Sequence, residues 1–101
     1  MHNVMGVAWF EDEAAYRRAL EIFTDPENMP ASFEAWKALV GRQCALIKDS
    51  GTVPLRADID PESFLAWCAD RGFLANAAGR VAFVNHVVLE YQKTGKGTII
   101  E

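Results

Sequence analysis

The sequence predicts a helix-rich α+β fold, with about four helices packed against a small sheet of two or three strands, in a single domain over residues 1–101. Four stretches repeat apolar residues at helical spacing, two short stretches are apolar and β-like, and helix-start and helix-stop residues separate them. Half of the 101 residues are hydrophobic, so the chain can bury a core without metals or disulfides.

The first elements predicted are a strand and a helix. Residues 4–9 are short and apolar, which favours a first strand or an extended arm laid across the core. Acidic residues at 11–13 then open a helix, where negative charge suits the positive end of the helix dipole. Its buried stripe consists of Tyr16, Ala19, Leu20 and Phe23. Asp25 ends this helix, because a residue before proline is disfavoured in the α conformation.

A longer helix is predicted from the N-cap Ser32 to about Asp49, and Ser50-Gly51 ends it. One face of this helix is apolar and carries Phe33, Trp36, Val40 and Ile47. Gln43 projects into the middle of that stripe, where a polar side chain is unexpected. We therefore treat Gln43 as a residue that needs a partner inside the fold.

The second half predicts a strand and two further helices. Residues 52–59 favour a strand, and Pro54 places it at a sheet edge or makes its start irregular. Asp60 caps the next helix, with Pro61 at its first position and Gly72 after its end. Asn76 caps a last helix to about Thr94, and residues 96–101 form either a frayed end or a third short strand.

Composition excludes several classes of function. The net charge is −4 and the basic residues are scattered, so a nucleic-acid partner is not expected. No apolar run approaches the length of a membrane helix, and the start of the chain does not resemble a signal peptide, so we expect no membrane partner and a cytoplasmic location. Cys44 and Cys68 are far apart and fall on apolar helix sides, which favours buried, reduced thiols.

The sequence contains no recognisable catalytic or metal-binding motif. Asp58 and Asp60 lie two apart where a predicted strand leads into a helix, and we do not expect them to converge on one ligand. Asp60 is explained as a cap, and Asp58 is expected to pair with Arg56 or Arg71. His86 projects to the polar side of the last helix without ligand spacing around it. We predict no catalytic residue, no metal site and no cofactor.

Two amides carry the first functional hypothesis. Gln43 and Asn85 fall in or beside apolar stripes, and a buried unpaired amide costs about 1–3 kcal/mol. Either Gln43 bonds a loop backbone or Asn85 across the interior, or the two line a small pocket with Trp36 or Trp67. The candidate pocket for a small molecule comprises Gln43, Asp58, Arg71 and Asn85, near a strand end.

The last helix carries the second hypothesis. Its apolar arc is wider than one buried face normally needs, which favours self-association or a protein partner. The alternative is that neighbouring elements wrap around the helix and bury the whole arc. The candidate interface consists of Phe83, Val84, Val87 and Tyr91.

Residues 59–72 read Ile-Asp-Pro-Glu-Ser-Phe-Leu-Ala-Trp-Cys-Ala-Asp-Arg-Gly. This segment is similar to one in small, functionally uncharacterised bacterial proteins that share an IDPxxFxxWCxxRG-like pattern. The resemblance extends over most of the chain through Asn85 and implies a bacterial origin. It implies no activity, cofactor or catalytic residue.

Two functions from different classes follow. The preferred one is a non-enzymatic protein-interaction module that forms a homodimer or binds another protein. The alternative is a small-molecule-binding protein or a minor enzyme that uses the candidate pocket. A DNA-binding regulator ranks third, because the chain is acidic and lacks a basic recognition helix.

Overall fold

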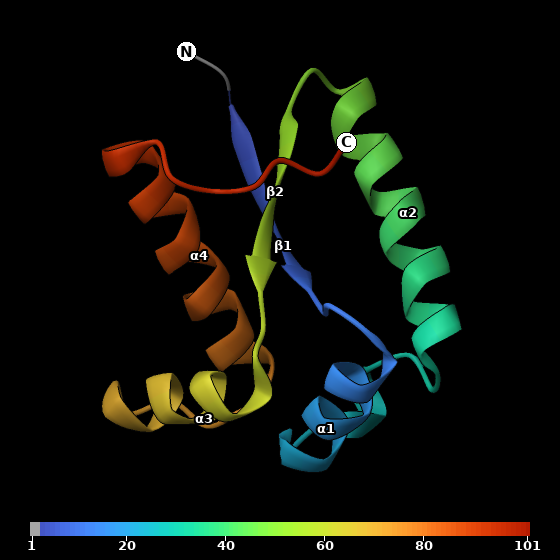
Figure 1. Cartoon of the computed structure of the whole chain (residues 1–101), viewed down its shortest axis with the longest axis vertical. Coiled ribbons are helices and arrows are strands. Elements are labelled where there is room, and N and C mark those ends of the chain that lie inside the picture. Colours follow the sequence, from blue (N-terminus) through green and yellow to red (C-terminus); the bar gives the residue numbers. More distant parts are fainter. Residues whose placement is uncertain (1–2) are drawn as a thin grey trace.

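The computed structural model describes residues 3–101, and its α+β class confirms the predicted fold (Figure 1). The described part contains two strands, four α-helices and a 3-10 helix. In chain order these are β1 (Val4–Trp9), α1 (Glu13–Ile22), the 3-10 helix (Pro26–Asn28), α2 (Phe33–Asp49), β2 (Val53–Asp58), α3 (Pro61–Asp70) and α4 (Ala77–Thr94).

The two strands are parallel, with Val4 opposite Val53 and Trp9 opposite Asp58. A parallel pair needs a long crossover connection, which α1, the 3-10 helix and α2 supply. Residues 95–101 form a tail that crosses the strands, and Ile99 makes a single antiparallel bridge to Leu55. The tail therefore contributes a bridge, and the sheet has two strands in the described part of the chain.

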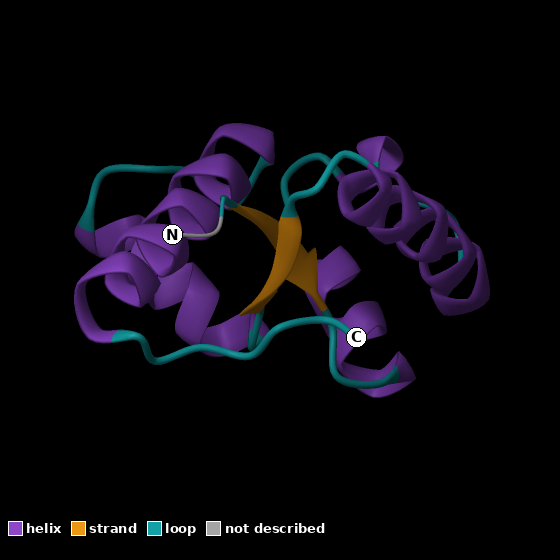
Figure 2. Cartoon of the chain, turned by 90° about the horizontal axis from the view of Figure 1, so that it is seen from above, coloured by secondary structure: helices purple, strands orange, loops and turns teal. Residues whose placement is uncertain are grey.

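The two long helices lie on opposite sides of the strands (Figures 1 and 2). On one face of β1, the Trp9 ring packs edge-on against Trp36 of α2, with 5.4 Å between the ring centroids. On the other face, Gly6 lies directly against Val84 and Val88 of α4. The side chains of odd-numbered β1 residues thus point toward α2, and those of even-numbered residues point toward α4, as the alternation of a strand requires.

The core is largely aromatic and lies below the strands, where α1, α2 and α3 meet. Its fully buried members include Phe10, Tyr16 and Phe64, with Phe23 and Trp36 beside them. Several ring pairs pack edge to face, the favoured geometry for aromatic side chains. The Tyr16 hydroxyl donates a hydrogen bond to the Pro30 carbonyl, so the buried hydroxyl has a partner.

Helix caps occur where the sequence predicts them. The side chains of Ser32, Asp60 and Asn76 each accept a hydrogen bond from a backbone N–H in the first helical turn. Pro61 is the first residue of α3. Gly95 ends α4 with a φ of 73°, in the left-handed region that glycine adopts without strain.

One buried ion pair joins the two halves of the chain. Asp25 and Arg80 form two parallel hydrogen bonds of 2.8 Å, and each side chain is 12 % exposed. Asp25 also accepts from Asn28 Nδ2 and from the Ala77 N–H at the start of α4. Chiefly because of the Arg80 hydrogen bonds, the pKa of Asp25 falls from 3.8 to about 2.

Stability should therefore decrease at low pH through Asp25. Since its carboxyl has a lower pKa in the folded state, its contribution is complete above pH 3.8 and disappears as the pH falls through about 2. The shift corresponds to about 2 kcal/mol. Urea unfolding of the wild type and of Asp25→Asn between neutral and acidic pH measures this loss. An equal acid dependence in both proteins would contradict it.

Helix α4 packs on β1, β2, α3 and the tail, which accounts for its wide apolar arc. Phe83 packs edge-on against Phe64 and Trp67. Val84 lies against Gly6 of β1, and Tyr91 lies against Gly97 of the tail. Much of the arc is therefore used within the chain, which favours the alternative in which neighbouring elements wrap around this helix.

Candidate functional site

The backbone groups of β1 divide between two edges. Val53 N–H donates to the Asn3 carbonyl at 2.9 Å, and Ile59 N–H donates to the Trp9 carbonyl at 2.8 Å. In a parallel ladder every second residue directs its N–H and C=O toward the neighbouring strand. The backbone N–H and C=O groups of odd-numbered β1 residues therefore point toward β2. Val4, Gly6 and Ala8 direct their backbone groups to the opposite edge.

In the described part of the chain, the tail covers the middle of the outer edge of β2, whereas the outer edge of β1 has no such cover. Arg56 N–H donates to the Thr98 carbonyl at 2.8 Å, and Ile100 N–H donates to the Pro54 carbonyl at 2.9 Å. The tail thus pairs with β2. Within residues 3–101, no hydrogen bond reaches the outward N–H and C=O groups of β1. We call this row of groups the free edge of β1.

A groove of about 630 Å³ runs along this free edge. Residues from both faces of β1 line it, including Met5 and Gly6, together with α2 and α4 from the two sides of the sheet. No residue of β2 is among the described residues that line it. A hollow that reaches both faces of one strand lies along its outer edge. We call it the β1-edge groove.

The rim of the β1-edge groove carries exposed apolar side chains from three elements. Met5 of β1 is 53 % exposed, Leu46 of α2 is 69 % exposed and Val81 of α4 is 61 % exposed. Exposed apolar residues that occur singly are ordinary, whereas three around one groove form an exposed apolar patch, which makes the β1-edge groove the candidate site.

The polar residues of the groove are mostly uncharged. Gln43 and Asn85 line it from α2 and α4, and both are exposed. The expectation that Gln43 lies inside the fold is therefore not met, because none of the described residues covers its side of α2 beyond the free edge of β1. Arg80 is the one charged residue among the described lining residues, and Asp25 neutralises it.

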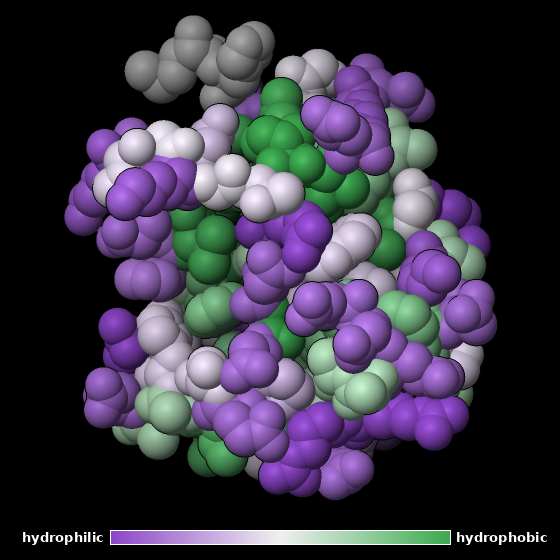
Figure 3. All heavy atoms as spheres, viewed as in Figure 1, coloured by the Kyte–Doolittle hydropathy of each residue, from purple (hydrophilic) through white to green (hydrophobic). Residues whose placement is uncertain are grey.

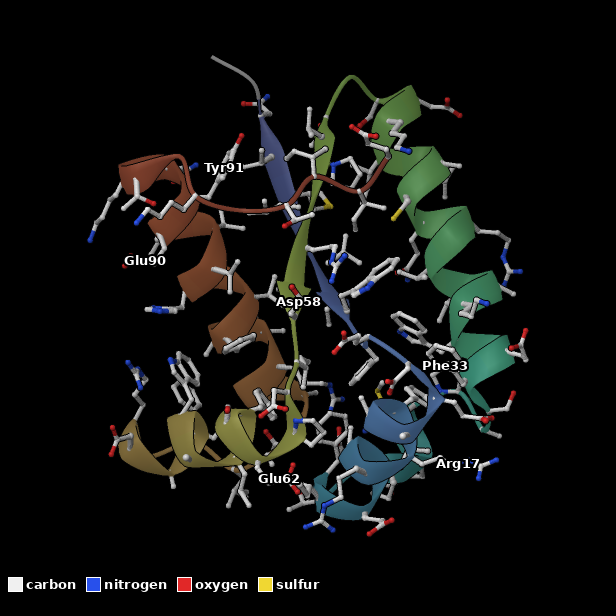
Figure 4. All side chains as sticks on the ribbon, viewed as in Figure 1. Arg17, Phe33, Asp58, Glu62, Glu90 and Tyr91 are labelled. Carbon is white, nitrogen blue, oxygen red and sulfur yellow. The ribbon has the colours of Figure 1, made fainter. Side chains whose placement is uncertain are left out.

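The other two residues of the predicted pocket lie elsewhere. Asp58 accepts a 2.7 Å hydrogen bond from Arg56, one of the two partners expected for it, and lies at the end of β2 (Figure 4). Arg71 stacks over Trp67, with its guanidinium carbon 4.5 Å from the ring centroid. The structure thus brings together Gln43, Asn85 and Trp36, and places Asp58 and Arg71 outside the groove.

The metal-ligating side chains of the described residues are scattered. No three His, Cys, Asp or Glu side chains within residues 3–101 are grouped as a metal site requires. His86 lies beside the Trp67 ring, with 5.6 Å between the ring centroids. Each helix in this part of the chain is too short or too polar to cross a bilayer.

Both cysteines are free and buried, and burial raises the pKa of each thiol. Because the thiolate is the reactive form, Cys44 and Cys68 should react with a disulfide reagent at least about tenfold more slowly in the folded protein than in denaturant. Absorbance during reaction with 5,5′-dithiobis(2-nitrobenzoate) measures both rates. A thiol that reacts equally fast in both states would contradict this expectation.

A scan against protein-family models, a search of curated proteins and a search of solved structures each found no match.

Periodicity alone does not identify the rim residues Met5, Leu46 and Val81, because it ranks a side chain by its helix or strand face and not by what covers that face. One sequence signal was present. Strand edges that face solvent usually carry lysine, proline or another blocking residue, and residues 4–9 contain none.

Proposed function

We propose that this chain is a non-enzymatic protein-interaction module, and that the β1-edge groove binds an extended segment of a protein. The observation that carries the proposal is the free edge of β1 at the floor of an apolar groove. Its N–H and C=O groups repeat at strand spacing, so another extended backbone satisfies them best. Met5, Leu46 and Val81 supply apolar contacts on either side.

The absence of edge-blocking residues supports the same function. A flat, apolar free edge promotes uncontrolled pairing between molecules, and proteins usually block such edges. Here the tail covers one edge of the sheet, Pro54 lies on that same outer side, and β1 has no equivalent protection in the described residues. An edge that is normally occupied by another protein segment does not need it.

Selection of short random peptides from a display library tests this function. Two variants alter the groove. In Ala8→Pro the free edge loses one N–H and no ladder hydrogen bond to β2, and Leu46→Glu puts a charge on the rim. Leu74→Glu is the matched control, since Leu74 is 66 % exposed and lies outside the groove.

We expect peptides selected on the wild type to bind at least about tenfold more weakly to both groove variants and unchanged to Leu74→Glu. Selected peptides that bind all four proteins equally, or a selection that enriches none although the protein is monomeric, would contradict the proposed function.

A small-molecule site is a second candidate, because Gln43 and Asn85 add hydrogen-bonding groups to an apolar groove of suitable size. A thermal-shift screen of metabolites tests it. A true ligand would raise the melting temperature of the wild type, and Gln43→Ala or Asn85→Ala would reduce the rise. Ligands whose shift is unchanged in both variants would bind elsewhere.

A further inference from the structure

We infer that the extended segment bound by the β1-edge groove is β1 of a second copy of this chain. The inference rests on the proposed function and names its partner. The two strands run antiparallel about a twofold axis beside Gly6, which joins two two-stranded sheets into one.

The free edge is complementary to itself. In an antiparallel pair, residues that point toward the partner strand exchange both of their backbone hydrogen bonds. An axis beside Gly6 sets Gly6 opposite Gly6 of the second copy and Val4 opposite Ala8 of the second copy. Every outward N–H and C=O of these three residues then has a partner. A twofold contact uses the same surface on both copies, so that surface must be complementary to itself. The backbone groups of a strand edge meet this requirement whatever the side chains are.

The apolar rim fits the same arrangement. A twofold axis perpendicular to the sheet leaves α2 on the same side as α2 of the second copy, and α4 on the same side as its own counterpart. Leu46 of one copy then lies on the same face of the joined sheet as Leu46 of the second copy. The two Val81 side chains share the opposite face in the same way. Apolar groups exposed in one copy can thus be covered by the equivalent groups of the other.

Charge does not oppose this contact. The chain carries a net charge of −4, so two copies repel each other wherever that charge is concentrated. Three exposed ion pairs lie on α1 and α3, formed by Arg17 with Glu13, and by Arg18 with Glu21 and Glu62. In Figure 3, hydrophilic side chains cover most of the lower half of the molecule, where α1 and α3 lie. Among the described residues that line the β1-edge groove, Arg80 is the one that carries a charge, and it is paired with Asp25.

The covered edge of β2 explains why the assembly would stop at two copies. Within residues 3–101 each copy has one free edge, and the tail pairs with the other through Thr98 and Ile100. Once the two β1 strands pair, each outer edge of the joined sheet carries a tail, which pairs with Pro54 and Arg56. The contact is closed, and it does not propagate into a fibre.

Light scattering after size-exclusion chromatography, over a range of protein concentrations, tests the inference. We expect the wild type and Leu74→Glu to be dimers, and Ala8→Pro and Leu46→Glu to dissociate at concentrations at least about tenfold higher than the wild type does. Circular dichroism and thermal unfolding of each variant confirm that it is folded. Because Leu46→Glu changes an exposed helix residue, it keeps the test valid if Ala8→Pro unfolds.

A wild type that stays monomeric at the highest concentration would overturn the inference, as would a dimer that both groove variants leave intact. The proposed function has a separate outcome. A monomer that still enriches groove-dependent peptides binds an extended segment of another protein, whereas a monomer that enriches none loses both the inference and the proposed function.

Discussion

Replacing Asp25 with alanine is expected to lower the free energy of unfolding by about 3–5 kcal/mol, because the change leaves Arg80 buried without its counter-ion. It also removes the acceptor for the Ala77 N–H at the start of α4 and for Asn28 Nδ2. A loss of this size is a large fraction of the stability of a small domain. Urea unfolding at neutral pH measures it.

The matched control is Glu21→Ala, which breaks an exposed ion pair with Arg18. Exposed pairs contribute little, so this variant should lose less than about 1 kcal/mol. The double variant Asp25→Ala with Arg80→Met should be more stable than Asp25→Ala alone, because it no longer buries an unpaired charge. Equal losses for Asp25→Ala and Glu21→Ala would show that the buried pair is not the main connection between the two halves.

Replacing Gly6 with valine is expected to cost about 3 kcal/mol, near the upper end for overpacked cores. A Cβ at Gly6 would lie against Val84 Cγ1 and 2.9 Å from Val88 Cγ2, so β1 and α4 would have to move apart. Thermal unfolding measures the loss. Adding Val84→Ala should restore part of it, because that change removes the side chain with the closest contact.

Gly41→Ala is the matched control for the glycine. It lies within α2, and a Cβ there meets nothing within 4 Å. Alanine should therefore stabilise the helix, by about 0.5–1 kcal/mol. A Gly6→Val protein as stable as the wild type would mean that α4 does not pack directly on β1, and the account of the groove walls would then fail.

Local signals made the helices predictable from the sequence. Asp60 with Pro61, Ser32 and Asn76 act within one helical turn, so the residues that specify a helix start are adjacent in the sequence and in space. The pairing of Asp58 with Arg56 is similarly local, because residues two apart on a strand share a face.

The remaining features depend on contacts between distant residues. Packing sets the parallel register of β1 and β2 and the bridge from Ile99 to Leu55. The periodicity of apolar residues contains no information about such packing. Gln43 shows the same limit of local patterns. Helical spacing places it in an apolar stripe, but the stripe is covered only where the sheet reaches, and the sheet ends at β1.

Backbone amide exchange of β1, followed by NMR at low and high protein concentration, tests the free edge most directly. We expect Met5, Val7 and Trp9 amides to be protected throughout, because they face β2. Gly6 and Ala8 amides should exchange rapidly in dilute protein and become protected as the concentration rises and two β1 strands pair. Equal protection of odd- and even-numbered amides in dilute protein would contradict the free edge, and Gly6 exchange that stays rapid at every concentration would contradict the pairing.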